Sequence, residues 1–132
     1  MVKTISISTT SRVEFLDITS KIEDIVEESG IRDGICYIFV PHTTAAVTIN
    51  EGADPSVRRD IIAQLDKIVP PRGDYTHMEG NSPAHIKASL IGSSQIVFVQ
   101  EGRISLGTWQ SIYFCEFDGP RTRRLIVKIT EK

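Results

Sequence analysis

GICYIFVPHTTAAVTIN, residues 34–50, contains a continuous apolar run, a short polar interruption and a second run that alternates. Residues 35–40 are apolar and rich in β-forming side chains, which predicts a strand covered on both faces at the centre of a sheet. Residues 45–50 have the period of two that is typical of a further strand. The interruption at 41–44 therefore places His42 at a strand end.

The remaining sequence predicts three helices and several more strands around this centre. Ser20 and Glu23 match a capping box, which predicts a helix over residues 20–29 with Gly30 as its stop. An N-cap side chain followed by proline occurs at 54–55 and again at 82–83, and predicts helices that end before Pro70 and at Gly92. The predicted strands are 2–7 and 13–18, joined as a hairpin, and 95–100, 104–106, 109–117 and 123–130. Strands with inserted helices indicate an α+β fold.

Composition indicates one globular domain that spans residues 1–132. With 40% apolar and 24% charged residues, the chain has neither the composition of a disordered protein nor that of a disulfide-rich secreted one. A formal charge of -2 argues against a nucleic-acid partner, and no apolar run approaches the ~18 residues of a membrane span. Cys36 and Cys115 lie within apolar runs and are expected to be buried free thiols. We expect a cytoplasmic location and no membrane partner.

All three histidines lie in polar stretches beside turn residues, at positions 42, 77 and 85. Neutral imidazole is a general base near pH 7 and the commonest metal ligand. With Ser82 as the N-cap, His85 occupies the first turn of a helix, where the positive dipole end disfavours a protonated ring and favours anions. The spacing of His77 and His85 is a weak metal signal alone, and each ring could simply bond a loop backbone.

Two acids and two arginines are further candidates. Glu51 follows a strand and precedes a glycine. It is a candidate base or ligand, and the alternative is an acid in a solvated loop. Glu116 interrupts an apolar strand and needs a partner if it faces inward. The turn at 118–120 would return Arg121 and Arg123 beside it, which predicts either an anion clamp or an ion pair.

Five motifs occur in order: HTTA at 42–45, INE at 49–51, His77 with GN at 80–81 and AH at 84–85, LGTWQ at 106–110, and EFDGPR at 116–121. Together they resemble the YjbQ-like family, labelled secondary thiamine-phosphate synthase. The resemblance implies an α+β domain whose mixed, mostly antiparallel sheet folds on itself as a distorted barrel with about three helices. It also implies a homotrimer and a weak ability to make thiamine phosphate from a pyrimidine pyrophosphate and a thiazole phosphate.

From the residues and the resemblance we predict a small trimeric enzyme that acts on an anionic, phosphorylated substrate. Three imidazoles favour zinc, whereas diphosphate departure would favour magnesium, so the expected cofactor is a divalent metal of either kind. The alternatives are a metal-dependent hydrolase and a non-catalytic module that binds a small metabolite. The predicted site residues are His42, His77 and His85 for the metal, Glu51 and Glu116 for catalysis, and Thr43, Asn81, Lys87, Gln110 and Arg121 for the substrate.

Overall fold

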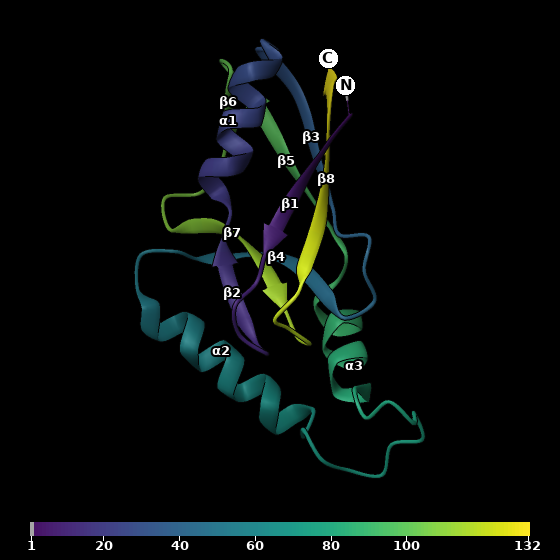
Figure 1. Cartoon of the computed structure of the whole chain (residues 1–132). Coiled ribbons are helices and arrows are strands. Elements are labelled where there is room, and N and C mark those ends of the chain that lie inside the picture. Colours follow the sequence, from purple (N-terminus) through teal and green to yellow (C-terminus); the bar gives the residue numbers. More distant parts are fainter. Residues whose placement is uncertain (1) are drawn as a thin grey trace.

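The computed structural model describes residues 2–132, in which eight strands and three helices are arranged as Figure 1 shows. In chain order these are β1 (Val2–Ser8), β2 (Glu14–Asp17), α1 (Thr19–Ser29), β3 (Asp33–Phe39), β4 (Ala45–Glu51), α2 (Pro55–Ile68), α3 (Ser82–Ile91), β5 (Ser94–Gln100), β6 (Arg103–Ser105), β7 (Gln110–Glu116) and β8 (Thr122–Glu131). The predicted α+β class is confirmed.

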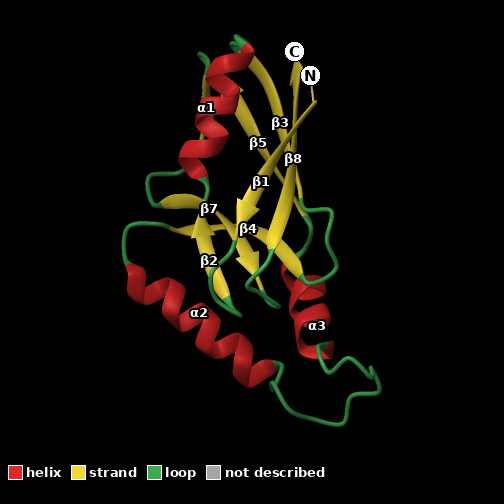
Figure 2. Ribbon diagram, viewed as in Figure 1, coloured by secondary structure: helices red, strands yellow, loops and turns green. Residues whose placement is uncertain are grey.

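The strands form two antiparallel sheets, one with the order β1-β8-β3-β5-β6 and one with the order β2-β7-β4. The predicted closure into a barrel is wrong, because β1 and β6 remain edges of the larger sheet while β2 and β4 remain edges of the smaller one. Figure 2 shows α1 beside the larger sheet, and α2 and α3 at the other end of the molecule. None of the helices in residues 2–132 is long and apolar enough to cross a membrane.

The predicted N-terminal hairpin is also wrong. β1 pairs with β8 and β2 pairs with β7, so the two N-terminal strands belong to different sheets. The link between them is held elsewhere: the Thr9 backbone N–H donates to Arg121 O at 2.9 Å, and its hydroxyl donates to Glu116 Oε1 at 2.7 Å. These bonds to the segment around the β7–β8 turn separate the strands.

β3 lies at the centre of the larger sheet as predicted, but only one of its faces is covered in this chain. Cys36 and Ile38 are fully buried, whereas Tyr37 and Phe39 are 38% and 45% exposed. Beside them on β5, Ile96 and Phe98 are 57% and 61% exposed, and Tyr37 pairs with Ile96 in the strand register. We call Tyr37, Phe39, Ile96 and Phe98 the β3–β5 face.

Helix boundaries follow the sequence signals with two corrections. α2 begins as predicted, with the Asp54 carboxylate accepting from Ser56 N at 2.9 Å. α1 has Ile18 at its N-cap without a side-chain cap, so the predicted capping box is wrong, although Gly30 ends the helix at a φ of 70°. The N-cap of α3 is Asn81, one residue before the predicted Ser82.

The two cysteines are free and buried, as expected. Burial raises the pKa of Cys36 to about 11 and also raises the pKa of Cys115. Cys36 belongs to the core cluster that contains residues of α1 and of both sheets, and Cys115 to a second cluster that contains residues of α2 and α3. Neither thiol is therefore in a setting that forms a reactive thiolate.

Candidate functional site

The three histidines line one cleft of about 710 Å³. His42 comes from the β3–β4 loop, His77 from the loop before α3, and His85 from the first turn of α3. The fold brings these segments together because the start of β4 lies beside the end of β7, where Ala45 pairs with Glu116. Polar residues of the β3–β4 loop, of the start of α3 and of the segment around the β7–β8 turn complete the cleft. They are Thr43, Thr44, Asn81, Asp118, Arg121 and Arg123.

Arg123 lines one wall of the cleft and belongs to a buried ion pair with Glu116. Glu116 is 0% exposed and accepts from Arg123 Nε at 2.9 Å and from Arg123 Nη2 at 2.5 Å. Its two oxygens also accept from the Thr9 hydroxyl and from the backbone N–H of Asp118. Burial raises the pKa of Glu116, but the hydrogen bonds from Arg123, Thr9 and Asp118 outweigh burial and leave this pKa below its usual value. Glu116 is therefore an ionised carboxylate whose oxygens are occupied.

Arg123 is held along one edge of its guanidinium group, through Nε and Nη2. Besides the two bonds to Glu116, its Nη2 donates to Thr44 Oγ1 at 2.8 Å. Within residues 2–132, Nη1 has no hydrogen-bond partner. Arg123 is thus a fixed cation that lines the cleft with free donors.

A second polar chain links Arg121 to the start of α3. Arg121 donates from Nε to Asp118 O at 2.7 Å and from Nη2 to Asp118 Oδ2 at 2.9 Å. The same carboxylate oxygen accepts from Asn81 Nδ2 at 3.0 Å. Burial raises the pKa of Asp118, but hydrogen bonds from Asn81 and Arg121 lower it further than burial raises it. The turn predicted at 118–120 therefore brings both arginines beside the two acids.

His42 is fixed by the backbone of β8. Its Nε2 accepts from the Arg124 backbone N–H at 2.9 Å. Burial lowers the pKa of His42, and the positive charges of Arg123 and Arg124 lower it further. The ring is neutral at pH 7, and its Nε2 lone pair is already used.

His77 and His85 form a pair, with ring centroids 5.4 Å apart and ring planes at 89°. Two imidazoles on one tetrahedral zinc ion, each bound at about 2.0–2.1 Å, would have centroids about 5 Å apart. The centroid separation alone is compatible with a shared ion, whereas Nε2 of His42 is already used as a hydrogen-bond acceptor. In the described part of the chain, no group of three or more His, Cys, Asp or Glu side chains is arranged to hold a metal.

Four predicted site residues do not line the cleft: Glu116, which is fully buried, and Glu51, Gln110 and Lys87. Glu51 and Gln110 pair with each other at the far end of β4 and β7, six residues from Ala45, or about 20 Å at ~3.3 Å per residue. The Glu51 carboxylate accepts from Ala53 N, and Gln110 Oε1 accepts from Gly107 N. Lys87 is 3% exposed and forms an ion pair with Asp66 of α2.

Sequence reasoning missed the two threonines that hold the ion pair. Thr44 lies inside the motif at 42–45, and its position beside His42 could have suggested a role. Thr9 lies in an ordinary polar link, and no local signal identifies it as a partner of Glu116, which is 107 residues away.

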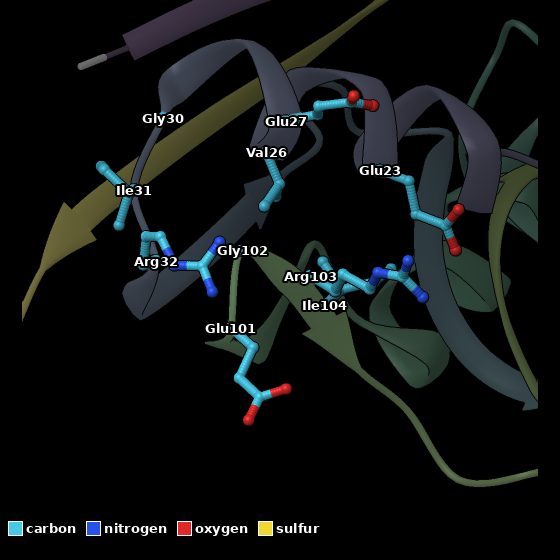
Figure 3. A pocket seen from close by; sticks show the side chains of 10 residues that line it. All are labelled: Glu23, Val26, Glu27, Gly30, Ile31, Arg32, Glu101, Gly102, Arg103 and Ile104. Carbon is cyan, nitrogen blue, oxygen red and sulfur yellow. The ribbon is translucent and has the colours of Figure 1, made fainter.

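A separate cavity of about 770 Å³ lies between α1 and the β5–β6 hairpin (Figure 3). Figure 3 shows Arg32 and Arg103 there, together with the carboxylates of Glu23, Glu27 and Glu101. The mixed charges favour no single class of ligand, and none of the residues selected from the sequence lines this cavity.

The chain matches the family model for UPF0047 protein YjbQ-like over residues 3–132. It is 52% identical to UPF0047 protein YugU of Bacillus subtilis, with 98% of each chain covered, and 54% identical to UPF0047 protein MJ1081 of Methanocaldococcus jannaschii, with 93% of this chain and 89% of that protein covered.

Two solved structures have the same fold along nearly the whole chain. A crystal structure of an uncharacterized conserved protein of the YjbQ/UPF0047 family from Clostridium acetobutylicum has a TM-score of 0.95 at 55% identity, covering 97% of this chain and 99% of that one. A YbjQ-like protein of unknown function from Sulfolobus solfataricus has a TM-score of 0.95 at 38% identity, covering 100% and 97%. The chain belongs to the UPF0047, or YjbQ-like, family.

Proposed function

We propose that the cleft binds a phosphorylated or otherwise anionic small molecule and catalyses a reaction on it. One observation carries the proposal: the fixed guanidinium of Arg123 and three imidazoles line the same cleft. Arginine suits a phosphate or carboxylate group, and neutral imidazole transfers protons near pH 7. Binding and proton-transfer groups therefore occur side by side.

The residues of the cleft have different roles in this proposal. Arg121 and Arg123 hold the anionic group, and the exposed Thr43 contributes a hydroxyl at the rim. Glu116 positions Arg123 instead of exchanging protons, because its oxygens already accept four hydrogen bonds. Asn81 holds Asp118, which in turn orients Arg121. His77 and His85 remain for acid–base chemistry.

A divalent metal is the expected cofactor, and His77 and His85 would hold it. Two nitrogen ligands favour zinc over magnesium, which prefers oxygen. When bound, zinc would polarise a phosphoryl or carbonyl oxygen and lower the pKa of a bound water molecule. The separation of the two rings supports metal-dependent hydrolysis as a second candidate function.

Thiamine-phosphate synthesis is a narrower form of the main proposal. Departure of diphosphate would need cationic side chains, and Arg121 and Arg123 lie in the cleft where such a group would bind. Lys87 has no part in this version, because it is buried against α2. Product formation from a pyrimidine pyrophosphate and a thiazole phosphate tests it directly.

We also propose that the chain assembles as a homotrimer through the β3–β5 face. Four large apolar side chains are exposed together on neighbouring strands, which is unusual on a monomer surface. A ring of three copies requires this face to meet a different surface on the next copy.

The cytoplasmic location stays a prediction, which the two free thiols support.

Arg121→Ala tests the proposed function, with Arg103→Ala as a matched control. Both arginines are exposed, but only Arg121 lines the histidine cleft. We expect Arg121→Ala to weaken the binding of phosphate esters about tenfold or more, since hydrogen bonds to charged groups contribute about 1.5–3 kcal/mol. Arg103→Ala should leave binding unchanged.

Turnover is tested with His85→Ala on a panel of phosphate esters. We expect this variant to keep anion binding and lose hydrolysis or transfer, because the ring acts on protons or a metal and not on the anion. Equal effects of Arg121→Ala and Arg103→Ala would contradict the assignment of the cleft. If the wild type binds these esters but turns over none of them, the protein is a non-catalytic binding module.

A further inference from the structure

His42 differs from the other two histidines in how its ring is held. Its Nε2 accepts a hydrogen bond from the Arg124 backbone N–H at 2.9 Å. A protonated imidazole has no acceptor, so this bond requires a neutral ring with its proton on Nδ1. The backbone of β8 therefore selects the Nδ1–H tautomer of His42.

A metal ligand needs a free nitrogen lone pair, whereas this tautomer of His42 has a free N–H donor. The nitrogen with a lone pair faces the backbone, and the nitrogen that remains free carries a proton. In the part of the chain that the structure describes, the one hydrogen bond of the His42 ring is made through Nε2, and none is made through Nδ1. A free N–H at the wall of a cleft donates to an acceptor on a ligand.

Arg123 supplies similar free donors in the same cleft. Its Nη1 makes no hydrogen bond to any residue from 2 to 132, while Nε and Nη2 are held by Glu116 and Thr44. The groups charged near His42 are Arg123, Arg124 and Glu116, and the Glu116 charge is paired with Arg123. Free donors beside a fixed cation favour an anionic oxygen.

We propose that His42 Nδ1–H and Arg123 Nη1 form a subsite for the oxyanion of the ligand, apart from the His77–His85 pair. The subsite rests on the proposed function and deepens it, because it assigns the three histidines two different tasks. His42 donates to a tetrahedral oxyanion such as a phosphate group. His77 and His85 keep lone pairs for a metal or for proton transfer.

The first test is nitrogen NMR of the ¹⁵N-labelled, ligand-free protein at pH 7. Long-range proton–nitrogen spectra distinguish the two neutral tautomers, and His42→Gln identifies the signals that belong to this ring. We expect the pattern of a ring protonated on Nδ1. A ring protonated on Nε2, or on both nitrogens, would overturn the subsite and leave the proposed function standing.

The second test uses inorganic phosphate as the probe and a pair of amide variants. The side chain of Asn reaches about as far as Nδ1, whereas that of Gln reaches the position of Nε2. His42→Asn can still donate to the ligand, while His42→Gln can accept from Arg124 N–H but lacks the Nδ1 donor. We expect His42→Gln to weaken phosphate binding about tenfold and His42→Asn to weaken it less.

Zinc binding separates the subsite from the histidine pair. Both His42 variants should bind zinc as the wild type does, and His85→Ala should lose zinc but keep phosphate. Equal phosphate affinity in wild type and His42→Gln would overturn the subsite alone. Failure of the wild type to bind phosphate would overturn both the subsite and the proposed function.

Discussion

Replacing Glu116 by glutamine should destabilise the fold strongly, because it breaks a fully buried ion pair. The carboxylate accepts four hydrogen bonds, from the Thr9 hydroxyl, the Asp118 backbone N–H and two nitrogens of Arg123. A glutamine amide has one oxygen to accept with, so its NH₂ group must face at least one of these donors. Removing one partner of a buried pair costs about 3–5 kcal/mol, and we expect Glu116→Gln to lower the free energy of unfolding by this amount.

Urea unfolding at pH 7.5 and one fixed protein concentration measures this loss. A second variant, Glu116→Leu with Arg123→Met, replaces both charges by apolar side chains of similar volume. Such replacements are often neutral or stabilising, so the double variant should be more stable than Glu116→Gln. A loss below about 1 kcal/mol in Glu116→Gln would refute this reasoning. A double variant whose loss equals the sum of the losses in Glu116→Leu and Arg123→Met, each measured singly, would refute the energetic coupling of the two residues.

Three further predictions concern pH, packing and assembly. The lowered pKa of His42 means that the unfolded chain binds its proton first, so stability should fall as pH drops below about 6.5, and His42→Gln should flatten this fall in urea midpoints measured between pH 7.5 and 5.5. Gly119→Ala should destabilise by about 1–3 kcal/mol or more, because the new Cβ would lie 2.3 Å from Ser11 O; an unchanged urea midpoint would contradict this. Phe98→Glu should convert trimers to smaller species in sedimentation, whereas Ile68→Glu, at an equally exposed site outside the β3–β5 face, should not; the same result for both would remove the proposed interface.

Elements that depend on neighbouring residues could be predicted from the sequence. The start of α2 follows from Asp54 and Pro55, whose side chains act within one turn of the chain. The strand over residues 45–50 follows from the alternation in the sequence, although Ala45, Ala46 and Val47 are all buried, because both faces of β4 are covered at its start. The contact of Arg123 with Glu116 is one of the two alternatives that the sequence predicts, the other being an anion clamp. The contact can be predicted because the intervening turn is short enough to return the chain.

Elements that depend on distant partners could not be predicted. β1 and β2 have hairpin-like spacing, but Thr9 bonds to residues more than 100 positions away and separates them. Glu51 and Lys87 have the chemistry of site residues, and only the three-dimensional arrangement shows one at the far end of β4 and the other against α2. A residue type limits the possible chemistry, while long-range pairing decides where that chemistry occurs.

The ion pair between Glu116 and Arg123 couples the stability of the fold to the cleft. Glu116 ends β7 in the smaller sheet, and Arg123 is the second residue of β8 in the larger sheet. Glu116 contacts the loop before β2 through Thr9, and Arg123 contacts the loop before β4 through Thr44. The bonds that join the sheets therefore also fix the cation that lines the cleft. His77 lies on an exposed loop outside this network. Changes in the ion pair should consequently reduce stability and anion binding together, whereas changes at His77 should alter metal binding and leave the free energy of unfolding nearly unchanged.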